Sequence, residues 1–258
     1  MSDPILLRHD TGAVASLTLN TPASLNALST AMLTALDAEL AAIAGSEIRV
    51  VIVSAVGKNF CAGHDLREIQ SHRADSDHGR AAFTALFDLC ARVMQKLTRL
   101  PQPTIASVQG TATAAGCQLA ASCDFIVASD TARFGVNGVN IGLFCSTPLV
   151  ALARKIPPAA AFELATTGEF ITAARAQTLG LVNRIASLDD LTTETRRFAE
   201  TLAAKLPAAL AIGKATRADP SLTEAYARAS AAMVANLMMP QTDEGLTAFL
   251  EKRQPDWA

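Results

Sequence analysis

The stretch TIASVQGTATAAGCQLA, residues 104–120, decides the fold that we expect of this chain. Its first seven residues predict a strand, and its last residues predict a helix. Between the two, residues 111–115 carry only methyl and hydroxyl side chains. Side chains this small let another group approach the backbone closely, so we expect a ligand or a neighbouring segment at this strand-to-helix junction.

A second junction has the same design. The run RVVIV, residues 49–53, is typical of a strand buried on both faces, and it leads through GKNFCAGHDL, residues 57–66, into a short helix. Each junction places small residues around a glycine, Ala62-Gly63 in one and Ala115-Gly116 in the other.

The first N–H groups of a helix lack intrahelical partners and carry the positive end of the helix dipole. Two such ends that face each other would offer two backbone donors to one negatively charged oxygen, which is an oxyanion hole. The alternative is that the small residues only let each helix pack tightly on a sheet. Neither junction has the spacing of a Walker or GxGxxG loop, so a nucleotide phosphate site is not expected.

The rest of the chain predicts an α/β core followed by helices. Strands alternate with helices up to residue 150, and helices dominate afterwards, so we expect a core over 1–195 and a helical region over 196–258. Residues 71–80 are polar and show no periodic spacing of apolar residues, so they predict a mobile surface loop. The other expected elements are a hairpin over 5–20, helices over 30–44, 66–70, 80–100, 148–156, 158–168, 172–180, 190–204, 221–237 and 242–253, and strands over 124–129 and 181–186.

Composition excludes several classes of function. The 22 Lys and Arg against 24 Asp and Glu give a net charge of -2, so the sequence offers no electrostatic case for nucleic acid or an anionic membrane. No apolar run approaches the roughly 20 residues that span a bilayer. The five cysteines lack CxxC spacing, so neither a metal site nor a disulfide framework is expected. The first residues have no targeting character, and a cytoplasmic location is expected.

Five segments, in order along the chain, resemble motifs of the crotonase (enoyl-CoA hydratase/isomerase) family. The resemblance covers about residues 5 to 253, and the stretch GLFCSTP is similar to a subgroup of enoyl-CoA-hydratase-domain-containing proteins. The matching segments are TPASLNALS (21–29), FCAGHDLREI (60–69), VQGTATAAGCQLAASCDFIVAS (108–129), ARFGVNGVNIGLFCSTP (132–148) and EGLTAFLEKRQP (244–255).

The resemblance implies a spiral of ββα turns with a C-terminal helical trimerisation region, assembled as a homotrimer or a dimer of trimers. It implies binding of an acyl group as its coenzyme A thioester, with no permanently bound cofactor. The family's oxyanion-hole amides map onto Ala62 and Ala115. The positions that map onto its CoA contacts are Ser24, Leu25, His64, Asp65 and Leu66, together with Phe249 and Lys252 on a last helix that the family often lends to a neighbour.

The sequence departs from the family at the two glutamates that its hydratases use for proton transfer. The first position is Gln118 and the second is Gly138. A glutamine amide has no usable pKa near neutrality and a glycine has no side chain, so neither is a general base. The Gln118 amide is still expected to reach toward the reacting carbons, because helical side chains lean toward the N-terminus.

Other groups near the expected site each have a functional and a structural interpretation. His64 has an unperturbed pKa that suits acid–base catalysis, and its alternative interpretation is a role in packing or in the CoA-contacting loop. Cys145 lies beside a helix start, which lowers thiol pKa, but it equally suits a pocket wall. Asn137 and Asn140 either hold a water or polar acyl group or form turns, and Asp124 is interpreted as structural.

Three functions remain open at this point. The first is an enzyme of hydratase or isomerase type, with a decarboxylase or a thioester hydrolase as other reactions of the same site. The second is a catalytically degenerate acyl-CoA-binding protein, and the third and weakest is an interaction protein that uses only its oligomer surface.

Overall fold

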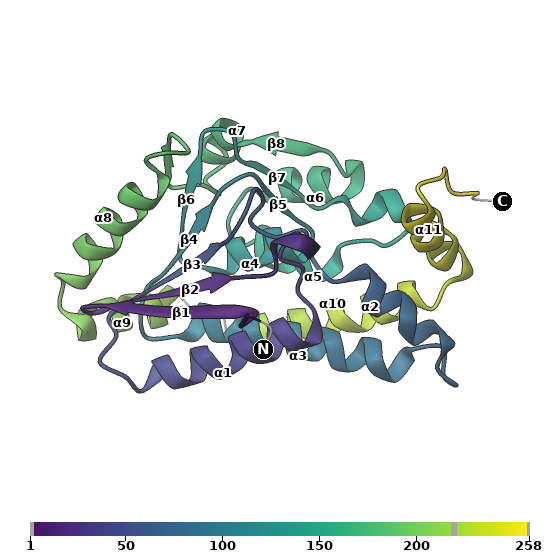
Figure 1. Cartoon of the computed structure of the whole chain (residues 1–258), viewed down its shortest axis with the longest axis horizontal. Coiled ribbons are helices and arrows are strands. Elements are labelled where there is room, and N and C mark those ends of the chain that lie inside the picture. The colour runs from purple at the N-terminus through teal and green to yellow at the C-terminus, as the bar shows by residue number, and fades with distance from the viewer. Residues whose placement is uncertain (1–2, 218–220, 257–258) are drawn as a thin grey trace.

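The computed structural model describes residues 3–217 and 221–256 (Figure 1), and its main feature is a six-stranded sheet with the order β1-β2-β3-β4-β6-β9. Strand β1 runs antiparallel to β2, and every other neighbouring pair in this sheet is parallel. The strands are β1 (Leu6–Thr11), β2 (Val14–Leu19), β3 (Val50–Ala55), β4 (Thr104–Val108), β6 (Phe125–Ser129) and β9 (Arg184–Ala186).

A second sheet of three short strands lies beside the first. It has the order β5-β7-β8, with β5 (Thr111–Thr113), β7 (Arg133–Gly135) and β8 (Phe170–Thr172). Each of β4 and β6 in the large sheet is followed by one of these short strands and then by helix, so the chain advances as repeated ββα turns. This repeat confirms the α/β core that the sequence pattern predicts and the spiral of ββα turns that the resemblance implies.

The helices form a layer on each side of the large sheet (Figure 1). Helix α8 covers one face, where Phe198 and Ala199 pack with Val14, Val50 and Ile105. The main core lies on the other face, under α1, α3 and α4. The helices are α1 (Thr30–Ala44), α2 (Leu66–Ser71), α3 (Arg80–Arg99), α4 (Ala115–Ser122), α5 (Ser146–Leu152), α6 (Pro158–Thr167), α7 (Ala173–Thr178), α8 (Leu191–Ala203), α9 (Pro207–Arg217), α10 (Leu222–Leu237) and α11 (Pro240–Glu251), with 3₁₀ turns η1 (Pro22–Ser24), η2 (His72–Ala74) and η3 (Asn137–Ile141).

The last two helices fold back over the core of their own chain. Helix α10 packs on α3 and α5, and α11 packs on α2 and η3. Figure 1 shows α11 in yellow with the C-terminus, at the opposite end of the molecule from α8. This return of the chain brings α11 next to the strand-to-helix junctions.

Local signals predicted most element ends correctly. The Ser29 hydroxyl accepts from the Met32 N–H and caps α1, which ends before Gly45 as expected. The spacing of apolar residues did not predict helix α9. It also did not predict the strands β5, β7 and β8, which at three residues each are too short to show a period. The predicted boundary at 195 falls inside α8, whose second half packs on the large sheet.

The segment 71–80 is more ordered than the mobile loop that its polarity predicted. It contains η2, and the Arg73 guanidinium donates to the Leu237 carbonyl at 2.7 Å and pairs with Asp243 at 2.9 Å. These long-range contacts tie the segment to the C-terminal helices, which is information that local sequence does not carry.

Two further observations bear on the class of protein. Within the described ranges, no helix is both long and apolar enough to cross a bilayer. All five cysteines are buried and free of disulfides, and the described residues hold no group of three His, Cys, Asp or Glu arranged to bind a metal ion.

Candidate active site

The two glycine-bearing junctions meet in the structure. The Cys61 N–H donates to the Thr111 carbonyl at 3.1 Å, and the Thr113 N–H donates to the Cys61 carbonyl at 3.0 Å. A Cβ added to Gly116 would lie 2.2 Å from the Cys61 carbonyl oxygen, so only glycine allows this approach. Gly63 has a φ of +96°, and a Cβ there would lie 2.9 Å from the Ala114 Cβ. The small residues are therefore required by one loop packing on the other.

The N–H group that is left free in the first loop is not the one that the resemblance implies. The Ala62 N–H donates to the Leu25 carbonyl at 3.1 Å, so it is engaged inside its own loop. Among the described residues, no acceptor takes the N–H of His64, two positions later, or that of Ala115. Ala115 is the first residue of α4, where a helix leaves its N–H groups unpaired. The cause is the path of the first loop, which turns the Ala62 N–H back toward Leu25 at the end of η1.

Both free N–H groups belong to residues that line one cavity of about 540 Å³. Its wall is mainly apolar, and along it the described chain places no carboxylate, lysine or arginine. The cavity is lined by Leu25, Asn59, Ala62, His64, Leu66, Ile69, Thr111, Thr113, Ala114, Ala115, Asn137, Gly138, Asn140, Ile141, Leu143, Cys145, Thr147, Pro148, Met233 and Phe249.

Seven of the predicted site residues lie on this wall, which are Leu25, Ala62, His64, Leu66, Ala115, Gly138 and Phe249. Phe249 belongs to α11 of the same chain and is 56% exposed, so in this structure the last helix contributes to its own cavity. Four predicted residues lie off the wall. The Ser24 hydroxyl donates to the Thr21 carbonyl, the Asp65 carboxylate caps α2, Lys252 ends α11 in a left-handed conformation, and Gln118 is buried elsewhere.

Gln118 faces helix α10, which differs from the expected reach toward the cavity. It has no exposed surface and does not line the cavity. Burial raises the pKa of Tyr226 on α10 to about 12, and the Gln118 and Ser122 side chains beside that hydroxyl act in the opposite direction. The Gln118 amide oxygen and nitrogen still lack a well-formed hydrogen bond to any described residue. The cause is the position of Tyr226, a residue distant in sequence whose hydroxyl lies beside Gln118 and Ser122, which local helix geometry does not reveal.

Gly138 has a neighbour in the space that a side chain would occupy. A Cβ at this position would lie 2.4 Å from the Leu143 carbonyl oxygen and 2.8 Å from the Cys145 Sγ. Burial raises the pKa of the Cys145 thiol to about 11, so the neighbouring helix start does not yield a thiolate at neutral pH. Cys145 therefore fills the cavity wall as a neutral side chain.

His64 is neutral at physiological pH. Its Nδ1 lies 3.1 Å from the Leu28 carbonyl oxygen, which only accepts, so Nδ1 carries the proton. Nε2 is buried and has no donor among the described residues. Burial lowers the pKa of the imidazole, and its ring meets the Phe87 ring edge-on at 5.3 Å.

This lowered pKa predicts an acid-sensitive stability. In the unfolded chain the imidazole has the ordinary pKa of 6.5, so near and below that pH it binds protons more readily than the folded imidazole does. The contribution of neutral His64 to the free energy of unfolding is therefore complete above pH 6.5 and is lost as the pH falls below it. We expect His64→Asn, whose amide retains a donor for Leu28, to lose less unfolding free energy between pH 7.5 and pH 5.5 than the parent. Urea denaturation at both pH values measures this difference, and His9→Asn on exposed β1 is the control. Equal losses in His64→Asn and the parent would contradict the assignment.

Asp124 is structural, as the sequence suggested. Its Oδ2 accepts from the Thr104 N–H at 2.9 Å and from the Thr104 hydroxyl at 3.0 Å. The same oxygen lies 2.6 Å from the Lys214 Nζ on α9, and both side chains are buried. This carboxylate joins β4 and β6 to α9 and lies off the cavity wall.

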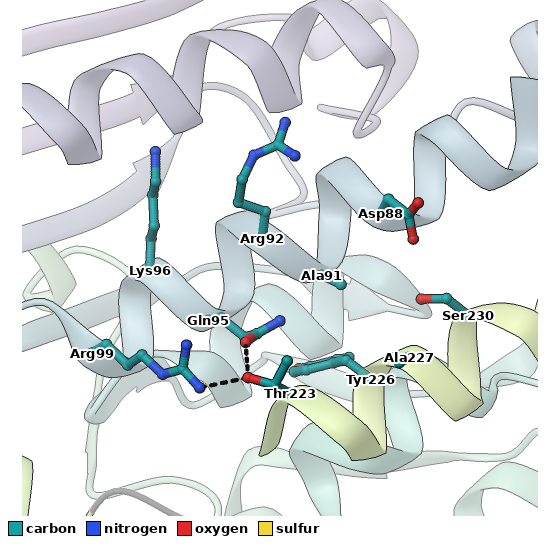
Figure 2. Close-up of a pocket in the computed structure, with 10 residues that line it drawn as sticks. All are labelled: Asp88, Ala91, Arg92, Gln95, Lys96, Arg99, Thr223, Tyr226, Ala227 and Ser230. Carbon is teal, nitrogen blue, oxygen red and sulfur yellow. Dashed lines mark hydrogen bonds between the residues drawn. The ribbon is translucent and has the colours of Figure 1, made fainter. Parts of the chain in front are cut away.

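A second hollow, of about 390 Å³, lies between α3 and α10 (Figure 2). Its polar groups engage one another, because Thr223 donates to the Gln95 side chain at 2.7 Å and accepts from Arg99 at 2.7 Å. Figure 2 shows Arg92 and Lys96 directed away from this groove, and both pair with Asp37 on α1. None of the predicted site residues lines the groove.

Comparison with known proteins identifies the family of this chain. Residues 9–258 match the family described as Enoyl-CoA hydratase/isomerase. The chain belongs to the enoyl-CoA hydratase/isomerase family. It is 41% identical, over 98% of its length and 86% of the relative, to a Xenopus laevis protein named "Enoyl-CoA hydratase domain-containing protein 3, mitochondrial".

Solved structures of family members are similar along nearly the whole chain. An enoyl-CoA hydratase from Mycobacterium smegmatis superposes with a TM-score of 0.79 at 46% identity, covering 99% of both chains. The human enoyl Coenzyme A hydratase domain-containing protein 3 superposes with a TM-score of 0.78 at 40% identity, covering 98% of this chain and all of the other.

The sequence did not single out Thr147, which the structure places on the cavity wall. Its side chain is 1% exposed, and its Oγ1 has no partner among the described residues. The adjacent proline and the short helix α5 were visible in the sequence, but nothing local indicated that this hydroxyl is buried without a partner.

Proposed function

We propose that this chain binds an acyl-CoA thioester in the 540 Å³ cavity and polarises its carbonyl with the N–H groups of His64 and Ala115. The observation that carries the proposal is the convergence of two unpaired backbone donors on one apolar cavity. Donors fixed in a site that excludes water stabilise a developing oxyanion strongly, and one such donor is typically worth about 3–4 kcal/mol. The coenzyme A moiety belongs to the substrate, so no permanently bound cofactor is needed.

The reaction is of hydratase or isomerase type without a pair of carboxylates. Residues at the two expected glutamate positions offer no base, and the cavity wall in the described chain has no other carboxylate. General acid–base groups typically contribute about 10²- to 10⁴-fold to a rate. Crotonyl-CoA hydration is accordingly expected at a kcat/KM lower by about that factor than in a family member with both glutamates, and a comparable kcat/KM would contradict the proposed mechanism.

A binding experiment tests the proposal itself. Calorimetric titration with butyryl-CoA, a saturated thioester, is expected to give saturable binding that Gly63→Ala weakens about tenfold or more. The added Cβ would lie 3.3 Å from the Ala115 nitrogen and 2.9 Å from the Ala114 Cβ, which displaces one donor from the other. The Cβ of Gly45→Ala meets nothing within 4 Å, so this variant is the matched control.

Circular dichroism of both variants separates loss of the site from loss of the fold. Folded Gly63→Ala protein that binds butyryl-CoA as tightly as Gly45→Ala would contradict the proposed site.

A second candidate is an acyl-CoA-binding protein that performs no chemistry. It is favoured by the titratable groups on the cavity wall, because His64 is neutral with a buried Nε2 and Cys145 is a neutral thiol. A panel of enoyl-, 3-ketoacyl- and malonyl-type CoA thioesters distinguishes the two candidates. Tight binding with no turnover of any member of the panel would favour the binder over the enzyme.

A further inference from the structure

Asn236, in the last turn of α10, hydrogen-bonds both peptide groups that flank Leu143. Its Oδ1 accepts from the Phe144 N–H at 2.7 Å, and its Nδ2 donates to the Gly142 carbonyl at 3.0 Å. A backbone N–H only donates and a carbonyl only accepts, so these partners fix which way the amide is turned. One side chain on a helix distant in sequence therefore sets the orientation of both peptides around Leu143.

Thr242 on α11 adds to this contact. Its hydroxyl accepts from the Asn236 Nδ2 at 3.0 Å and donates to the same Gly142 carbonyl at 3.0 Å. Thr242 is 1% exposed, so its hydroxyl bonds these two groups rather than water. Both C-terminal helices are thus joined to the segment that follows η3. Both also reach the cavity, through Met233 of α10 and Phe249 of α11.

The segment 142–145 shapes one wall of the cavity, which Leu143 and Cys145 both line. The peptide that joins Leu143 to Phe144 is trans, so its C=O points away from the N–H that Asn236 binds. That oxygen faces Gly138, where an added Cβ would lie 2.4 Å from it. Asn236 therefore holds the Leu143 carbonyl in the space that a side chain at position 138 would occupy.

We propose that Asn236 is a positioning residue of the thioester site, which fixes the wall at Leu143 and Cys145 and thereby the space open to the acyl group. This inference rests on the proposed function, since it concerns the same cavity. Leu143 and Cys145 offer no charge to the phosphates of coenzyme A, so the acyl chain is the part of the ligand that this wall fits. Asn236 does not line the cavity, so it acts through the backbone of the segment 142–145 and not by contact with the ligand.

Calorimetric titration with two ligands tests the proposal. Asn236→Leu keeps a side chain of similar size and removes both bonds, so that the ligand must order the freed segment. This variant is expected to weaken butyryl-CoA about fivefold to tenfold, comparable to the net contribution of one hydrogen bond. Coenzyme A, which lacks the acyl group, is expected to keep its Kd.

A matched control and a milder variant accompany this measurement. The Asn183 Oδ1 also accepts a backbone N–H, that of Ile126 at 2.8 Å, but lies off the cavity wall, so Asn183→Leu is expected to bind butyryl-CoA as the parent does. Thr242→Val leaves the bond between Asn236 and Phe144 in place and keeps the proposal testable if Asn236→Leu does not fold. It is expected to weaken butyryl-CoA by less than Asn236→Leu does and to leave coenzyme A unchanged.

A double-mutant cycle tests the link to position 138 without any ligand. In the parent, the Cβ of Gly138→Ala would meet the Leu143 carbonyl, whereas in Asn236→Leu the freed peptide can turn away. Gly138→Ala is therefore expected to raise the unfolding equilibrium constant by a factor about fivefold smaller in Asn236→Leu than in the parent, as urea denaturation measures.

The outcomes separate this inference from the proposed function. Equal effects of Gly138→Ala in the two backgrounds, or a butyryl-CoA affinity that Asn236→Leu and Thr242→Val leave unchanged, would overturn the inference while thioester binding stands. Equal weakening of butyryl-CoA and coenzyme A, or the same weakening in Asn183→Leu, would also overturn it, because the effect would then be one of general stability. Failure of the parent to bind any thioester would overturn the proposed function and this inference together.

Discussion

Asp124→Ala is expected to lower the free energy of unfolding by about 3–5 kcal/mol, the largest effect that we expect of a single substitution on stability. Asp124 and Lys214 have side chains only 6% and 7% exposed, and their oxygen and nitrogen lie 2.6 Å apart. Removing the carboxylate takes away the negative charge that lies 2.6 Å from the buried Lys214 ammonium. It also removes the acceptor of the Thr104 N–H and hydroxyl.

Chemical denaturation measures this loss, and an exposed ion pair of the same chemistry gives the control. Glu224 and Arg228 lie 3.9 Å apart with side chains 79% and 74% exposed, so Glu224→Ala is expected to cost less than about 1 kcal/mol. A loss in Asp124→Ala no greater than in Glu224→Ala would show that the buried pair contributes little.

Restoring both glutamates, as Gln118→Glu with Gly138→Glu, is expected to leave hydratase activity unrestored and to destabilise the protein. A Cβ at position 138 would lie 2.4 Å from the Leu143 carbonyl oxygen, and overpacking of this kind typically costs about 1–3 kcal/mol. A glutamate at 118 would be buried against α10, off the cavity wall, where burial disfavours its charged form. Neither carboxylate would therefore act on a ligand in the cavity.

The measurements are crotonyl-CoA hydration and thermal unfolding of the double variant and of each single variant. Gly45→Glu is the matched control, because position 45 has open space for a side chain. A gain in kcat/KM of about 10²-fold or more in the double variant would contradict this expectation. It would show that the cavity wall accepts both carboxylates and that the site differs from a hydratase site only at these two residues.

The sequence predicted the fold through signals that are local and redundant. The short helix predicted over 66–70 is present as α2, and Asp65 caps it through the Arg67 and Glu68 N–H groups. The glycines of the two junctions indicated a close approach, and Gly116 does lie against Cys61. Helix α9 was missed because four of its 11 residues are alanine and Gly213 interrupts it, which leaves few large apolar side chains to mark a helical period.

The site was predicted less completely, because its details depend on contacts between distant segments. Whether Ala62 or His64 offers the free N–H depends on the Leu25 carbonyl, nearly forty residues earlier in the chain. The direction of Gln118 depends on Tyr226 of α10, and the space at Gly138 depends on Leu143 and Cys145. The cytoplasmic location and the trimer or dimer of trimers stay predictions.

The most direct test of the account is the vibration of the bound thioester carbonyl. Difference infrared spectroscopy with butyryl-CoA carrying a ¹³C-labelled thioester carbonyl isolates that one band. If the His64 and Ala115 N–H groups polarise the carbonyl, the band moves to lower wavenumber on binding, and the shift shrinks in Gly63→Ala. A band that stays at its position in water while the thioester is bound would contradict the central claim.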